Sequence, residues 1–130
     1  MSLRATIIHL LTTHRLPLSD EKLLQVSIAD VLGAAALEYA REVHLGPRDI
    51  VDFMVYPRAE GWEHLSGPRV GTAIEVKIKG NRRDIYRQVE RYCAYPVVGE
   101  IVLATNVPMA LPDFIVGKPT GVAALGRGWL

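Results

Sequence analysis

The chain is poor in cysteine and has no long apolar segment. Its one cysteine, Cys93, excludes an intramolecular disulfide and a cysteine-rich zinc site, and we expect it to be a small buried thiol. No apolar run approaches the roughly 20 residues that a membrane-spanning helix needs. The N-terminal run over residues 5–11 is interrupted by His9 and lacks the small-residue cleavage site of a secretion signal. We therefore expect a soluble, cytoplasmic protein with no membrane partner.

The chain also has no large excess of positive or negative charge. The 130 residues carry a formal net charge of +1 at pH 7, so any surface that binds nucleic acid must be local. Hydrophobic residues make up 49% and charged residues 22%, which is typical of a folded chain and argues against disorder. Glycine-rich phosphate loops, nucleophile elbows and Ser-His-Asp arrangements are absent, and the histidines lack metal-ligand spacing. We expect one domain over residues 1–130.

Apolar periodicity and turn residues predict an α/β protein. A helix from about residue 20 to residue 37 or 38 begins after Ser19, an N-cap residue that precedes two acidic residues. The other predicted elements are a helix at 4–13, strands at 39–45, 49–56 and 72–79, a helix at 82–94, a buried strand at 100–105 and an edge strand within 121–130. This order of elements predicts a mixed sheet flanked by helices.

The predicted strand at 72–79 contains alternating apolar and charged residues. Side chains of a strand alternate between two faces, so Glu75, Lys77 and Lys79 share one face. Asp52 lies in the preceding predicted strand, which can place a second carboxylate beside Glu75 and Lys77. Two carboxylates bind a hard divalent cation such as Mg²⁺, and a neighbouring ammonium orients a water or stabilises a phosphate under attack. The alternative is an ordinary ion pair on a solvent-facing surface.

The candidate site residues come in the order of a known superfamily. They are Asp52, then Glu75, Val76 and Lys77, then Gln88 and Tyr92. This order resembles the PD-(D/E)XK (restriction-endonuclease-like) nuclease superfamily, and the last pair resembles the Gln-x-x-x-Tyr signature of its RecB-type branch. One departure is that Val51, not proline, precedes the aspartate. The resemblance covers about residues 19–105. It implies a core of helix, three-stranded antiparallel meander, helix and strand, with the N-terminal helix and a C-terminal extension at 106–130 outside it.

The resemblance also implies a Mg²⁺ centre in which Mn²⁺ can substitute. Asp52 and Glu75 would bind the metal, together with the backbone carbonyl of Val76. The superfamily often uses a further acidic residue on the first core helix. Glu21 matches that position best, although a carboxylate there can also simply favour the helix dipole, and Glu38 is the alternative.

The reaction implied by the resemblance is hydrolysis of DNA phosphodiester bonds. Lys77 would position the attacking hydroxide or balance the developing charge, and Gln88 and Tyr92 would orient Lys77 or the substrate backbone. The alternative is a catalytically silent module of the same fold that binds nucleic acid or supports an assembly. A third interpretation is an unrelated small α/β interaction protein, in which Glu75 and Lys77 form an ordinary ion pair.

A basic stripe follows the candidate site. Arg83, Arg87 and Arg91 recur every fourth residue on the predicted helix, close to Lys79 at the end of the strand. Arginine makes bidentate phosphate contacts, so we expect these four side chains to contact the DNA backbone, although a solvated charged face is an equal alternative. Trp62, in the loop before the third strand, can stack on an unpaired base.

The chain length and the DNA cleavage implied by the resemblance lead to predictions about specificity and oligomeric state. A chain of 130 residues has little room for a separate specificity domain, so structure-selective or relaxed cutting is expected rather than recognition of a long site. Cutting both strands of a duplex requires two active sites, so we expect a homodimer. The apolar residues 122–130 are the candidate interface.

Overall fold

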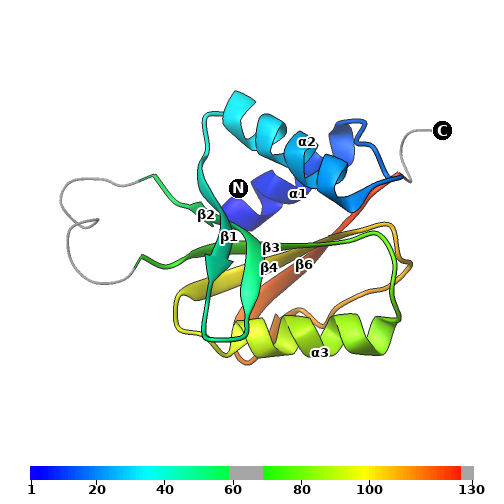
Figure 1. Cartoon of the computed structure of the whole chain (residues 1–130). Helices are drawn as coiled ribbons and strands as arrows, with labels where there is room; N and C mark the ends of the chain where they lie inside the picture. The colour runs from blue at the N-terminus through cyan, green and yellow to red at the C-terminus, as the bar shows by residue number, and fades with distance from the viewer. Residues whose placement is uncertain (59–68, 127–130) are drawn as a thin grey trace.

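A computed structural model describes residues 1–58 and 69–126 of the chain. Within these ranges it is a mixed α/β structure with three helices and a six-stranded open sheet of order β1-β2-β3-β4-β6-β5. The helices are α1 (Leu3–Thr13), α2 (Glu21–Ala34) and α3 (Arg82–Cys93). The strands are β1 (Glu38–His44), β2 (Ile50–Tyr56), β3 (Gly71–Lys77), β4 (Val98–Thr105), β5 (Phe114–Ile115) and β6 (Lys118–Ala124). Helices α1 and α2 cover one face of the sheet and α3 covers the other (Figure 1).

The direction of the strands changes at the centre of the sheet. β1, β2 and β3 are successively antiparallel, whereas β3 and β4 are parallel, as are β4 and β6. The crossover from β3 to β4 runs through α3 and places that helix on the sheet face opposite α1 and α2. The mixed sheet flanked by helices that the sequence predicts is therefore confirmed.

Each face of the sheet has its own apolar core. Ile74 and Val76 pack with buried side chains of α1 and α2, whereas Ala73 packs with buried side chains of α3. This alternation follows from the two-residue repeat of a strand. The position of Glu75, between Ile74 and Val76, accordingly directs its side chain toward the α3 layer, where it is buried. Within the described ranges, no helix is both long enough and apolar enough to cross a membrane.

The start and end of α2 differ from the prediction. The N-cap is Asp20 rather than Ser19, because the Asp20 Oδ1 accepts a hydrogen bond from the Lys22 backbone N–H at 2.8 Å. The helix ends at Ala34, and Ala36 has a φ of 58°, a left-handed conformation that turns the chain toward β1. The prediction that the helix continues to residue 37 or 38 was therefore wrong by one turn.

The C-terminal region corrects two expectations. β6 begins at Lys118, before the predicted range of 121–130, and lies between β4 and β5 rather than forming the sheet edge alone. α1 packs on this strand at Gly121, where a Cβ atom would lie only 2.6 Å from the Ile8 side chain. Within the expected dimer interface at 122–130, Ala123 and Leu125 belong to the α1–α2 core and are buried, whereas Val122 and Ala124 are partly exposed. Residues 127–130 lie outside the described ranges, so the interface stays a prediction.

Candidate functional site

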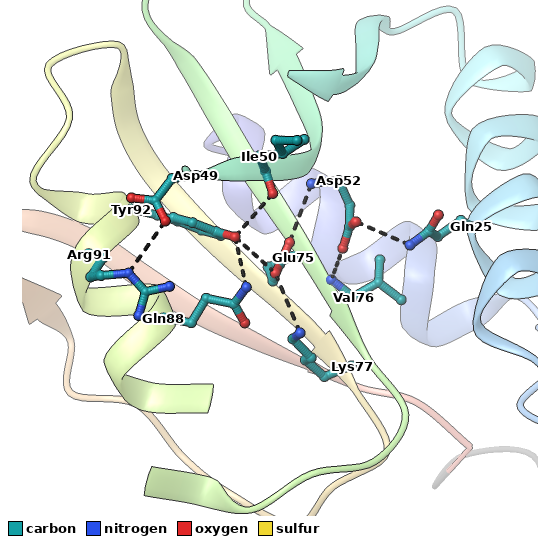
Figure 2. A network of polar contacts seen from close by, with 10 residues as sticks. All are labelled: Gln25, Asp49, Ile50, Asp52, Glu75, Val76, Lys77, Gln88, Arg91 and Tyr92. Carbon is teal, nitrogen blue, oxygen red and sulfur yellow. Dashed lines mark hydrogen bonds and ion pairs between the residues drawn. The ribbon is translucent and has the colours of Figure 1, made fainter. Parts of the chain in front are cut away.

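The two predicted carboxylates meet where β2 and β3 separate. The paired register of these strands ends at Phe53 and Ile74, and Asp52 and Glu75 occupy the next positions on the two strands. Side chains take over the hydrogen bonding there. The Val76 backbone N–H donates to the Asp52 Oδ2 at 2.8 Å, and the Asp52 backbone N–H donates to the Glu75 Oε1 at 3.3 Å (Figure 2). The fork between the strands thus holds two carboxylates side by side, as the sequence predicted.

Glu75 is a buried acid with a raised pKa. Its side chain is 4% exposed, and its Oε2 lies 3.8 Å from the Lys77 ammonium. Burial first, and then the negative charge and hydrogen bonding of Asp52, raise the pKa of Glu75 to about 9, against the smaller opposing effect of Lys77. The direction of this shift favours retention of a proton by the Asp52–Glu75 pair at neutral pH. Such a pair of carboxylates sharing a proton is also the kind of site where a divalent cation can replace that proton.

Helix α3 supports Glu75 from one face of the sheet. The Tyr92 hydroxyl lies 3.0 Å from the Ile50 carbonyl and 3.4 Å from the Glu75 Oε2, and it accepts a hydrogen bond from the Gln88 amide at 2.8 Å. Burial first, and then the charge of Glu75, raise the pKa of the Tyr92 phenol, so the hydroxyl stays a donor at neutral pH. The predicted pair thus reaches the site. The Tyr92 hydroxyl reaches the Ile50 carbonyl and, at a longer distance, Glu75, and the expected orienting contact of this pair with Lys77 or the substrate stays a prediction.

Helix α2 supports Asp52 from the other face. The Gln25 side-chain amide donates to the Asp52 Oδ1 at 3.1 Å (Figure 2). Gln25 was missing from the predicted site. The only signal for it in the sequence is its position one helical turn after Glu21, the acidic residue predicted on this helix.

The two acidic candidates for a further ligand lie in different places. Glu21, together with Lys77 and Lys79, lines a groove of about 470 Å³ between the start of α2 and the end of β3. Glu38 pairs in register with Tyr56, four positions along β2 from the fork, and its carboxylate forms bidentate contacts of 2.6 and 2.8 Å with Arg69. Glu38 is therefore wrong as the alternative, since it is both distant from Asp52 and already paired.

The basic residues predicted to contact DNA differ in the contacts that they make. Lys79, Arg83 and Arg87 are exposed. The Arg91 side chain is also exposed, at 55%, but its Nε lies 3.4 Å from the Asp49 Oδ1, and the Asp49 carboxylate also accepts a hydrogen bond from the Tyr95 hydroxyl at 2.8 Å. Arg91 thus joins α3 to the turn before β2, which competes with a phosphate contact. Trp62 lies outside the described residues.

The donor set suits a small hard cation. The described part of the chain contains no cluster of three or more His, Cys, Asp or Glu residues that could hold a metal ion. Mg²⁺ does not require one, because it usually keeps several waters and binds through one or two carboxylates and the phosphates of a substrate. Asp52 and Glu75 provide such a pair. The site is therefore compatible with Mg²⁺ held jointly by the protein and a phosphate ligand.

Comparison with protein-family models, curated proteins and solved structures finds no match to this chain. The chemistry of the site must be inferred from its own residues.

Proposed function

We propose that this protein is a Mg²⁺-dependent nuclease of the PD-(D/E)XK type that hydrolyses DNA phosphodiester bonds. The observation that carries the proposal is the position of Asp52 and Glu75 at the fork between β2 and β3, with the Lys77 ammonium 3.8 Å from Glu75. The element order supports it, since α2, the antiparallel strands β1 to β3, α3 and the parallel strand β4 follow the order of the restriction-endonuclease-like core.

Asp52 and Glu75 are the proposed metal ligands, and the backbone carbonyl of Val76 is a proposed additional oxygen. Glu21 lines the neighbouring groove and does not cluster with the two acids among the described residues, so its part as a further ligand stays a prediction. When bound, Mg²⁺ would lower the pKa of a coordinated water molecule and screen the negative charge of the scissile phosphate. The carboxylates provide the negative charge that retains a divalent ion, and their attachment to adjacent strands fixes their separation. Mn²⁺ has similar oxygen preferences and is expected to substitute.

Lys77 is the proposed catalytic cation. Its side chain is 27% exposed and lines the groove shared with Glu21, so it is accessible to a substrate while remaining beside Glu75. An ammonium there can donate a hydrogen bond to the attacking water or to a phosphate oxygen, and its charge opposes the negative charge that develops during attack. Tyr92 is proposed to restrain Glu75 through its contact of 3.4 Å with the Oε2, and Gln88 is proposed to hold the Tyr92 hydroxyl by donating to it.

Arg83 and Arg87 are proposed to hold the DNA backbone, and Arg91 contributes less. Arg87→Ala is expected to weaken binding of a short duplex several-fold and to reduce the salt dependence by about one counterion, because an exposed guanidinium is free to pair with a phosphate. Arg91→Ala is expected to change the affinity less, because its guanidinium is already paired with Asp49. Fluorescence anisotropy in Ca²⁺ at several salt concentrations measures both. Equal losses for the two variants would contradict this division of the stripe.

The nuclease is tested by incubating the protein with supercoiled plasmid, linear duplex, single strand and a four-way junction, in Mg²⁺, Mn²⁺ or EDTA. We expect cleavage of at least one DNA in both metals and none in EDTA. Plasmid that is only nicked would indicate active sites that each cut one DNA strand independently, whereas double-strand cuts would support the expected homodimer. Binding without any cleavage would instead favour the catalytically silent module, and neither binding nor cleavage would favour an interaction protein.

A further inference from the structure

The carboxylate pair is supported from both sides of the sheet. On the α3 side, Tyr92 contacts Glu75, and on the α2 side, Gln25 contacts Asp52. The remaining donors to the pair are the backbone N–H groups of Asp52 and Val76, which the strands themselves fix. Gln25 is thus the one α2 side chain that donates a hydrogen bond to a carboxylate at the fork within the described residues.

The Asp52 carboxylate depends on Gln25 for its orientation. Its Oδ2 is held by Val76 at 2.8 Å, and its Oδ1 by Gln25 at 3.1 Å. When a metal ion replaces the proton that Asp52 shares with Glu75, loss of the Gln25 contact leaves the Val76 N–H as the remaining donor to the carboxylate, which can then rotate about its bond to Cβ. A metal-binding carboxylate whose orientation is not fixed binds its ion less well, and the partners that orient such ligands typically affect metal affinity about 10- to 100-fold.

We infer that Gln25 is a positioning residue of the metal centre, setting the orientation of Asp52 from helix α2. This inference rests on the proposed function, because it assumes that Asp52 binds a divalent metal. It gives α2 a specific role: the helix contributes a neutral amide donor at the second turn in addition to the Glu21 carboxylate at the groove. An amide is suited to this role, since it donates to one carboxylate oxygen without adding a negative charge to the site.

The inference is tested by calorimetric titration of Mn²⁺ into wild type, Gln25→Ala, Gln25→Glu and Val26→Ala. Val26 is the matched control because it is the next residue of α2 and is 46% exposed. We expect Gln25→Ala to bind Mn²⁺ about tenfold more weakly, and Val26→Ala to bind within about twofold of wild type. Gln25→Ala affinity within about twofold of wild type would overturn the inference.

Gln25→Glu replaces the neutral donor with a carboxylate that cannot donate a hydrogen bond to Asp52. A carboxylate at this position repels Asp52, so the melting temperature in EDTA is expected to fall. The same carboxylate adds an oxygen near the cation, so Mn²⁺ affinity is expected to exceed that of Gln25→Ala. A merely structural contact would lower the melting temperature of Gln25→Ala in EDTA and leave its Mn²⁺ affinity within about twofold of wild type. Wild type that binds no Mn²⁺ would defeat the proposed function itself, which distinguishes that failure from failure of the inference alone.

Discussion

Lys77→Ala is expected to reduce Mg²⁺-dependent DNA cleavage by at least about a hundredfold. The variant removes the ammonium that lies 3.8 Å from the Glu75 Oε2 and lines the groove shared with Glu21. Without Lys77, water molecules would have to reorient to stabilise the negative charge of the transition state, whereas the fixed ammonium is already in position. Because Lys77 is partly exposed and the carboxylate pair retains a proton at neutral pH, loss of the contact between Lys77 and Glu75 is expected to cost about 1 kcal/mol of stability or less.

The measurement is the initial rate of plasmid cleavage by proteins purified in parallel. Lys22→Ala is the matched control, since Lys22 is an exposed lysine that takes part in the α2 N-cap only through its backbone N–H. It is expected to cleave at the wild-type rate. Thermal unfolding of each protein shows whether the fold is intact. A folded Lys77→Ala variant that keeps a third or more of the activity would remove Lys77 from the mechanism.

Glu75→Gln is expected to stabilise the protein in EDTA at pH 8 and to flatten the dependence of its stability on pH. The pKa of Glu75 is raised by burial and by Asp52 from 4.5 to about 9 in the folded protein. The folded state therefore binds a proton that the unfolded state releases above its own pKa, and this contribution to stability is complete below about pH 4.5 and is lost as the pH rises toward 9. Between pH 6 and pH 8, the wild type should lose about 2 to 3 kcal/mol.

Urea unfolding in EDTA at pH 6, 7 and 8 measures this effect. Glutamine has nearly the shape of the protonated acid and does not ionise, so the slope should largely disappear in Glu75→Gln. Glu90→Gln is the control, because Glu90 is an exposed glutamate of α3, and its slope should match that of wild type. A wild-type stability that rises over this pH range, or a Glu75→Gln variant with the wild-type slope, would show that the carboxylate pair does not retain a proton.

Much of the site could be predicted because local patterns determine it. The alternation along β3 places Glu75 and Lys77 on one face whatever the rest of the fold does. The four-residue spacing of Gln88 and Tyr92 places them on neighbouring turns of one helix, and Asp52 lies in a recognisable apolar strand. The order of these elements then suggested that they converge, and the fork between β2 and β3 brings the acids together.

Other features could not be predicted because they arise from contacts between distant segments. Arg91 has the same spacing as Arg87, yet it pairs with Asp49 because the turn before β2 packs against the end of α3. Gln25 looks like an ordinary helix-surface residue until α2 is placed on the sheet beside Asp52. The register of β6 depends likewise on its parallel pairing with β4. The N-cap of α2 is Asp20 rather than the expected Ser19, because the Asp20 side chain accepts the hydrogen bond from the Lys22 backbone N–H.

The central claim is that Asp52 and Glu75 form a divalent metal site, and the most direct measurement is the melting temperature at pH 8 in EDTA and in excess Mg²⁺ or Mn²⁺. A ligand at about 100 times its Kd adds about 2.7 kcal/mol, which for a chain of this size raises the melting temperature by about 5 to 10 °C. The account predicts such a rise for wild type and for Asp30→Ala, an exposed control on α2, and none for Asp52→Ala. No rise in wild type, or an equal rise in Asp52→Ala, would contradict it.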